Sequence, residues 1–285
     1  MTTTSKQPRK RSSIDWDSIT ISDNYMFVTV FSDPELCREL LQRVLGMLIR
    51  EVVITQSEKT LKTDPYSHAI RMDVYAADSD TVYDIEMQTS DQHNLEKRSR
   101  YYQSTIDRDC LDAGTPYEEI VDSIVIFICT FDPFERGLPR YTITPHCRED
   151  GKEMDDGTMR VFVNSTAWDD CNDPKLRAFL RYVAEGIIEG DDKFLGDVDG
   201  SVRRQRERPE WRRIRMLFSQ ELMWERARGR AEGRAEGQDT ERQENALLLQ
   251  ALREAGREGE IIEAVADPAT RQALLDEFGI GEKAQ

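Results

Sequence analysis

Between Ile70 and Thr89, hydrophobic and polar residues alternate in two short stretches that are separated by the polar letters DSD. Alternation with a period of two predicts two β-strands joined by a tight turn. If the loop is Ser79–Asp80, the shortest hairpin connection, Asp73 lies directly across from Glu86. This register depends on the loop, because a change of one residue would move every side chain to the opposite face.

The predicted register divides the hairpin into two faces. The polar face carries Asp73, Tyr75, Asp84, Glu86 and Gln88. The apolar face, which should pack on the core, carries Met72, Val74, Ala76, Tyr83, Ile85 and Met87. Two carboxylates about 5 Å apart on a sheet are destabilising unless a cation balances them, and Mg²⁺ favours oxygen ligands. The alternative is a hairpin whose acidic face is simply solvated.

The remaining pattern predicts helices that flank a sheet. Apolar spacing of three and four residues predicts helices at 23–27, from Ser32 onward, at about 93–113, from Pro174 to about 190, and at about 211–228. Further strands are expected at 51–61, 122–131, 141–144 and 160–163. The continuous apolar run DSIVIFICTF is typical of a central strand that is buried on both faces. This order predicts an α/β domain.

The composition changes from Asp191 onward. Residues 191–210 are expected to be a linker with an arginine-rich segment, and residues 211–285 a helical region. The repeat RGRAEGRAEGQ places a glycine at every fourth position, which costs a helix about 1 kcal/mol per site but leaves a narrow strip for a neighbouring helix. We expect a self-association arm rather than a flexible tether, because 245–255 and 261–278 carry apolar stripes that need a partner.

The length of 285 residues suits one sizeable domain with appendages, and residues 1–16 are expected to be a disordered tail. No apolar run approaches the roughly 18 residues of a membrane span, and the basic N-terminus lacks the apolar segment of a secretory signal. Five cysteines without a CxxC motif and three histidines without ligand spacing argue against a zinc site. A cytoplasmic location with free thiols is expected.

The net charge of −16 bears on the partner, because an acidic protein repels nucleic acid at long range. Binding to DNA would require a local basic surface or a bound cation. The segment 203–215 supplies such a surface, with seven arginines against two glutamates.

An ordered set of sequence blocks resembles the Rpn family, recombination-promoting nucleases that are also described as PD-(D/E)xK nuclease family transposases. The blocks are DNYMF, VYDIEMQ, KRSRYYQS, YEEIVDSIVIFICTFDPF and the Gly-Glu repeat. Asp73 with Glu86, Met87 and Gln88 resembles the D…(D/E)xK signature. Two residues depart from it: Met72 replaces the proline, and Gln88 replaces the lysine, a replacement that this family shares. The resemblance implies a restriction-endonuclease-like mixed sheet flanked by helices over 17–190, with a helical C-terminal extension.

The resemblance also implies metal-dependent hydrolysis of DNA, linked to recombination or transposition, with Mg²⁺ as the cofactor and Mn²⁺ as a substitute. The implied metal ligands are Asp73, Glu86 and the backbone carbonyl of Met87, with Asp23 as an additional candidate. Gln88 would orient the attacking water, and Lys97 or Arg98 would supply the missing positive charge. The residues expected to contact DNA are Arg98, Tyr102, Gln103, Arg203, Arg204 and Arg206.

Two other functions remain open. The first is a nuclease-fold protein that is catalytically weak or inactive and binds nucleic acid or a protein partner, which the absent lysine and the acidic charge favour. The second is oligomerisation or scaffolding by the C-terminal helices, with the α/β domain as cargo. In each case we expect a homo-oligomer formed through the C-terminal helices and no membrane partner.

Overall fold

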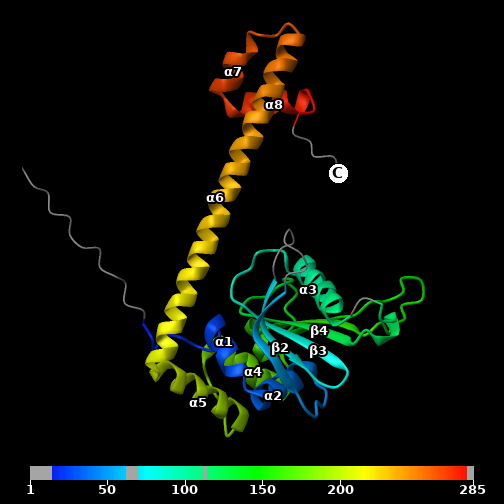
Figure 1. Cartoon of the computed structure of the whole chain (residues 1–285), viewed down its shortest axis with the longest axis vertical. Helices are drawn as coiled ribbons and strands as arrows, with labels where there is room; N and C mark the ends of the chain where they lie inside the picture. Colours follow the sequence, from blue (N-terminus) through cyan, green and yellow to red (C-terminus); the bar gives the residue numbers. More distant parts are fainter. Residues whose placement is uncertain (1–14, 62–69, 112–113, 281–285) are drawn as a thin grey trace, which may run out of the picture. The chain divides into compact units, whose positions relative to one another are not determined.

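The computed structural model describes residues 15–61, 70–111 and 114–280 (Figure 1). It divides into two compact units, residues 1–215 and 216–285. Most of the predicted disordered tail lies outside the described residues, as does the predicted loop at 62–69. No helix among the described residues has the length and the apolar content needed to span a membrane.

The first unit is built on a mixed six-stranded sheet with the order β1-β2-β3-β4-β6-β5. Its strands are β1 (Val53–Leu61), β2 (Ile70–Ala77), β3 (Thr81–Gln88), β4 (Asp122–Cys129), β5 (Arg140–Ile143) and β6 (Thr158–Asn164). Pairing is antiparallel between β1, β2 and β3 and between β5 and β6, whereas β4 runs parallel to both β3 and β6. The predicted strands are confirmed, and β4 is central and almost wholly buried because its apolar run faces helices on both sides.

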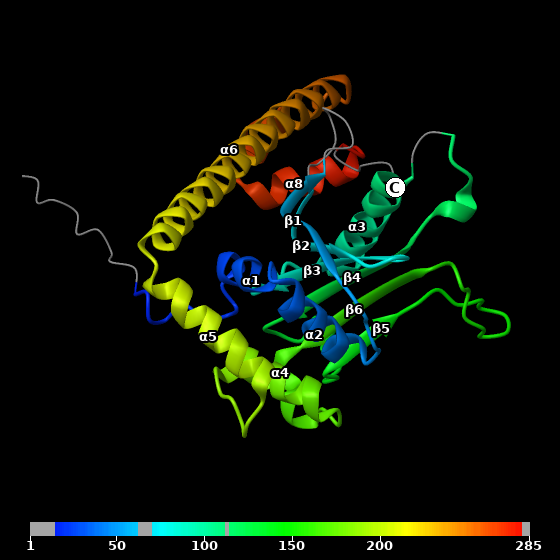
Figure 2. The same cartoon turned by 60° about the horizontal axis from the view of Figure 1, so that its bottom comes forward.

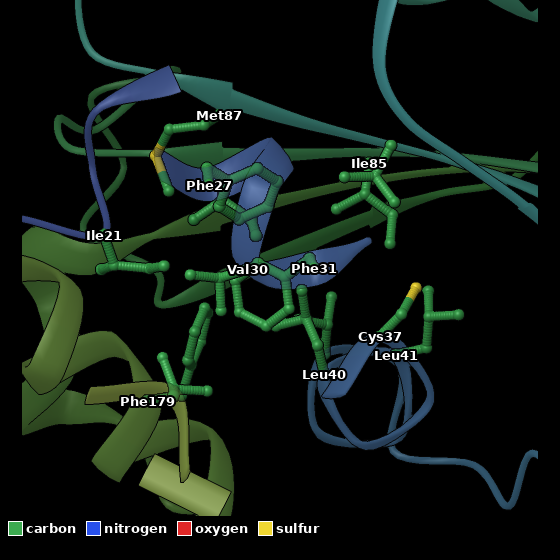
Figure 3. Close-up of a cluster of buried hydrophobic side chains, with 14 of the residues drawn as sticks. Ile21, Phe27, Val30, Phe31, Cys37, Leu40, Leu41, Ile85, Met87 and Phe179 are labelled. Carbon is green, nitrogen blue, oxygen red and sulfur yellow. The ribbon is translucent and has the colours of Figure 1, made fainter. Parts of the chain in front are cut away.

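Helices cover both faces of this sheet (Figure 1; Figure 2). One face is covered by α1 (Asn24–Phe31), α2 (Pro34–Leu45) and α4 (Pro174–Glu185), and the other by α3 (Leu95–Cys110). Asp23 and Asp33 cap α1 and α2, and the side-chain oxygens of both accept hydrogen bonds from backbone amides of the first turn. Figure 3 shows Ile85 and Met87 of β3 within the apolar cluster formed with α1 and α2.

Three predictions about this unit were wrong. Residues 191–210 are mainly a helix, α5 (Lys193–Glu207), because apolar side chains at Phe194, Val198 and other positions spaced by three or four pack into the core between the charged residues. The next helix, α6 (Pro209–Glu254), continues through the glycine repeat instead of ending near 228. Met72 packs in the apolar cluster between the sheet and α3, not in the cluster between the sheet and α1 and α2. At Met72, β2 is no longer paired with β3 and can twist away from it.

The second unit is a small helical cluster. It comprises α6 from residue 216, α7 (Glu260–Ala266) and α8 (Pro268–Glu277). Its core residues are Leu248, Leu252, Ala264, Leu274 and Leu275. Ile262 and Val265 on α7 stay exposed, and a cavity of about 410 Å³ opens beside Leu249 and Val265.

Candidate active site

The acidic pair lies where β2 and β3 diverge. Their pairing ends at Val74 and Ile85, in the register predicted from a two-residue loop. One step further along, the backbone amide of Asp73 donates to Oε1 of Glu86 at 2.9 Å, and the amide of Met87 donates to Oδ2 of Asp73 at 3.1 Å. Each carboxylate therefore accepts a hydrogen bond from a backbone amide of the opposite strand, and these two bonds connect the strands at the fork.

The polar face of this hairpin is buried under α3 and not solvated. Asp84 and Glu86 are both buried, and neither oxygen of Asp84 receives a hydrogen bond from the described residues. Burial raises the pKa of Glu86 well above its usual value, and repulsion by Asp73 and then by Asp84 raises it further. The pKa of Asp84 is raised mainly by burial and next by Asp73. Three acidic groups therefore share a site in which burial and mutual repulsion disfavour ionising all of them at once.

Arg98 on α3 supplies the countercharge. Its Nη2 donates to Oε2 of Glu86 at 2.9 Å, its Nη1 to Oε1 of Gln88 at 2.9 Å, and its Nε to the hydroxyl of Tyr102 at 3.0 Å. The guanidinium carbon lies 5.1 Å from the ring centre of Tyr102 and 5.3 Å from that of Phe127, within the range of cation–π attraction. All three nitrogens of one arginine are thus bonded to residues around the fork.

Gln88, which replaces the lysine of the signature, is held in a fixed orientation. While its Oε1 accepts from Arg98, its Nε2 donates to the backbone carbonyl of Ser90 at 2.7 Å. The positive charge expected near this position comes from Arg98. Lys97 is exposed, because adjacent helical residues are rotated by about 100° and only one of them can face the sheet.

Two other predicted contact residues on α3 are buried in the protein. Tyr102 accepts the hydrogen bond from Arg98 and so positions that side chain. Gln103 donates from Nε2 to the backbone carbonyl of Ser123 at 2.7 Å and also to its hydroxyl, at the start of β4. Gln103 therefore stabilises the attachment of α3 to the sheet and does not face a surface that DNA could reach.

The remaining predicted site residues make their contacts with residues outside the acidic fork. Asp23 accepts a hydrogen bond from the amide of Met26 and pairs with Arg215 at 2.6 Å, so its carboxylate serves α1 and α6. Arg206 donates to the carbonyl of Ile19 at 2.6 Å. On the last turns of α5, Arg204 is exposed, as is Arg203, which pairs with Asp199.

The donor chemistry of the fork suits a hard divalent cation, since Mg²⁺ is commonly held by one or two carboxylates together with water and substrate phosphate. Asp73 and Glu86 provide those carboxylates. The pKa of Glu86 is raised first by burial and then by repulsion from Asp73 and Asp84, and a cation would offset that repulsion. Within the described ranges, no group of three or more His, Cys, Asp or Glu side chains is arranged to hold a metal ion. The protein alone thus offers an incomplete coordination shell.

Asp84 is the site residue that the sequence-based prediction left out. The alternation of β3 placed it on the same face as Glu86, which was the available signal. Its significance depends on complete burial beside the other two carboxylates, and that burial is produced by α3, a separate element.

A helix-flanked mixed sheet with an acidic pair at a strand fork defines a PD-(D/E)xK-like α/β fold. Residues 22–144 match the model of a family described as PD-(D/E)XK nuclease family transposase. The matched segment contains the fork and α3, and the match is consistent with the predicted resemblance to the Rpn family. Comparisons with curated proteins and with solved structures gave no match.

Proposed function

We propose that this protein is a metal-dependent endonuclease that hydrolyses phosphodiester bonds in DNA, in a process linked to recombination or transposition. The proposal rests on one observation: Asp73 and Glu86 lie opposite each other at the strand fork, beside the guanidinium of Arg98. The family match over residues 22–144 supports the same class of reaction.

Asp73 and Glu86 would hold Mg²⁺ or Mn²⁺, together with the backbone carbonyl of Met87. When bound, such an ion lowers the pKa of a coordinated water and offsets negative charge on the phosphate. The chain's own residues then orient the reactants. The fixed amide of Gln88 can position water, and Arg98 can bind a phosphate oxygen, because a guanidinium presents several donors in one plane.

The residues proposed to contact DNA are Arg98 at the fork and, on a separate element, the exposed arginines Arg203 and Arg204 of α5. Phosphate contacts by arginine provide most of the sequence-independent affinity for DNA and offset the net charge of −16. The Nε of Arg206 is already used in a hydrogen bond to the carbonyl of Ile19, so Arg206 is not included among these residues.

A specific observation favours the alternative, a nuclease-fold protein that binds without cutting. Both oxygens of Glu86 already accept hydrogen bonds, one from Asp73 and one from Arg98. A cation can bind the carboxylate of Glu86 only if the side chain of Arg98 moves away from it. If the arginine stays in place, the fork would stabilise the fold and the protein would act as a binding module.

Plasmid nicking in Mg²⁺, Mn²⁺, Ca²⁺ or EDTA separates the two functions. A metal-dependent nuclease should convert supercoiled plasmid to open circles with Mg²⁺ or Mn²⁺, be inactive in EDTA, and lose this activity in the Glu86→Gln variant. Equal nicking by the wild type and the variant, or none by either under every condition, would contradict the endonuclease proposal.

We further propose that the second unit assembles the protein into a homo-oligomer. Ile262 and Val265 on α7 are 77% and 83% exposed, and they lie in the unit that carries the 410 Å³ cavity. Burying such side chains against a second copy would remove apolar surface from water. Sedimentation velocity of the full chain tests this, and a monomer at all concentrations would contradict it.

A further inference from the structure

Arg98 binds the carboxylate that the proposed cation also requires. Its Nη2 lies 2.9 Å from Oε2 of Glu86, and the other oxygen of Glu86 is taken by the amide of Asp73. Of these two donors, only the arginine side chain can leave without breaking the backbone geometry of the fork. Any cation that reaches Glu86 must therefore contend with Arg98.

We propose that Arg98 and the divalent cation compete for Glu86, so that the arginine acts as a displaceable latch and sets how tightly the protein binds metal. This inference rests on the proposed function, because it assumes that the fork binds a cation. It adds a role for Arg98 that precedes any contact with DNA: the residue governs loading of the site.

The geometry favours displacement over a permanent clamp. The side chain of Arg98 is 27% exposed while that of Glu86 is 3% exposed, so the arginine can move toward solvent and the carboxylate cannot. The rings of Tyr102 and Phe127 flank the guanidinium and can retain it by cation–π attraction after the ion pair breaks. The hydrogen bond from the amide of Asp73 keeps Glu86 in its orientation meanwhile.

Displacement would couple metal binding to phosphate binding. A guanidinium released from Glu86 has donors free for a phosphate oxygen, and a phosphate that binds Arg98 removes the competitor from Glu86. Coupling of two binding events is reciprocal, so DNA should tighten metal binding by the same factor by which metal tightens DNA binding. Without DNA, the wild-type protein should bind the metal weakly.

The test is Mn²⁺ binding to the full chain without DNA, followed by the electron paramagnetic resonance signal of free Mn²⁺. Arg98→Gln removes the competitor, and hydrogen bonds to charged groups are strong enough that we expect affinity to rise about tenfold or more. Arg98→Lys keeps a charge but cannot bond Glu86, Gln88 and Tyr102 together, so an intermediate rise is expected. The control is Arg100→Gln, which removes the same charge from an exposed position on α3 and should bind as the wild type does.

Each outcome decides the matter. Tighter binding in both Arg98 variants but not in Arg100→Gln supports competition, as does measurable binding only after Arg98 is replaced. Unchanged or weaker binding in folded Arg98→Gln and Arg98→Lys, with Mn²⁺ bound by the wild type, overturns the latch but leaves the metal site standing. Absence of binding in the wild type and in all variants overturns the metal site itself, and the latch with it.

Discussion

Replacing Asp73 with alanine is expected to abolish Mg²⁺-dependent nicking of supercoiled plasmid. The change removes one of the two carboxylates at the fork, and a metal ion stabilises the transition state of such reactions by several kcal/mol, which corresponds to a rate loss of about a thousandfold or more. Circular dichroism should show that the fold persists, because β1, β3 and the helices keep their own contacts.

Asp73→Asn separates chemistry from structure in this experiment. The asparagine carbonyl can still accept the hydrogen bond that the amide of Met87 donates to Asp73, yet it lacks the negative charge that a cation needs. It should be as inactive as the alanine variant. The matched control is Glu96→Gln, which neutralises an exposed acid in the first turn of α3 and should nick at the wild-type rate. Normal nicking by Asp73→Asn would remove Asp73 from the site.

Replacing Asp84 with asparagine is expected to stabilise the protein above neutral pH. The pKa of this carboxyl is raised by burial and by Asp73, so the folded state holds its proton to a higher pH than the unfolded state, where the pKa is about 3.9. The free energy of unfolding of the wild type should therefore fall as pH rises from about 4 toward the folded pKa, by up to about 1.4 kcal/mol per pH unit from this group. Asparagine cannot ionise and escapes that loss.

Denaturant unfolding at pH 5 and pH 8 measures this effect. We expect the advantage of Asp84→Asn over the wild type to be larger at pH 8, by about 1–3 kcal/mol after allowance for the imperfect hydrogen bonding of a buried amide. Asp155→Asn, at an exposed position, should show the same pH dependence as the wild type. An advantage that is equal at both pH values, or larger at pH 5, would show that Asp84 ionises freely in the folded protein.

Local features of the hairpin were predictable from the sequence because they depend on few residues. Alternation and the short DSD turn determine the register, and the register alone brings Asp73 opposite Glu86. The caps of α1 and α2 are equally local, since the capping hydrogen bonds to Asp23 and Asp33 come from amides two or three positions later. In these cases the interactions span only a few positions along the chain.

Features that depend on packing between distant elements were not predictable. From the sequence, either Lys97 or Arg98 could supply the positive charge. The way α3 packs on the sheet decides between them, because it directs Arg98 toward Glu86. The same packing buries Asp84 and uses Gln103 to bond Ser123. α5 was misread as a linker because its buried apolar positions are surrounded by charged residues, so the average composition concealed the helical period.

The proposed metal site is tested most directly by the position of Mn²⁺ in crystals of the protein grown with the ion, located by its anomalous scattering. The proposed metal site predicts a peak bonded to a carboxylate oxygen of Asp73 and one of Glu86, with the guanidinium of Arg98 turned away from Glu86. A fork in which Arg98 still binds Glu86 and no Mn²⁺ lies between the two carboxylates at saturating concentration would contradict it.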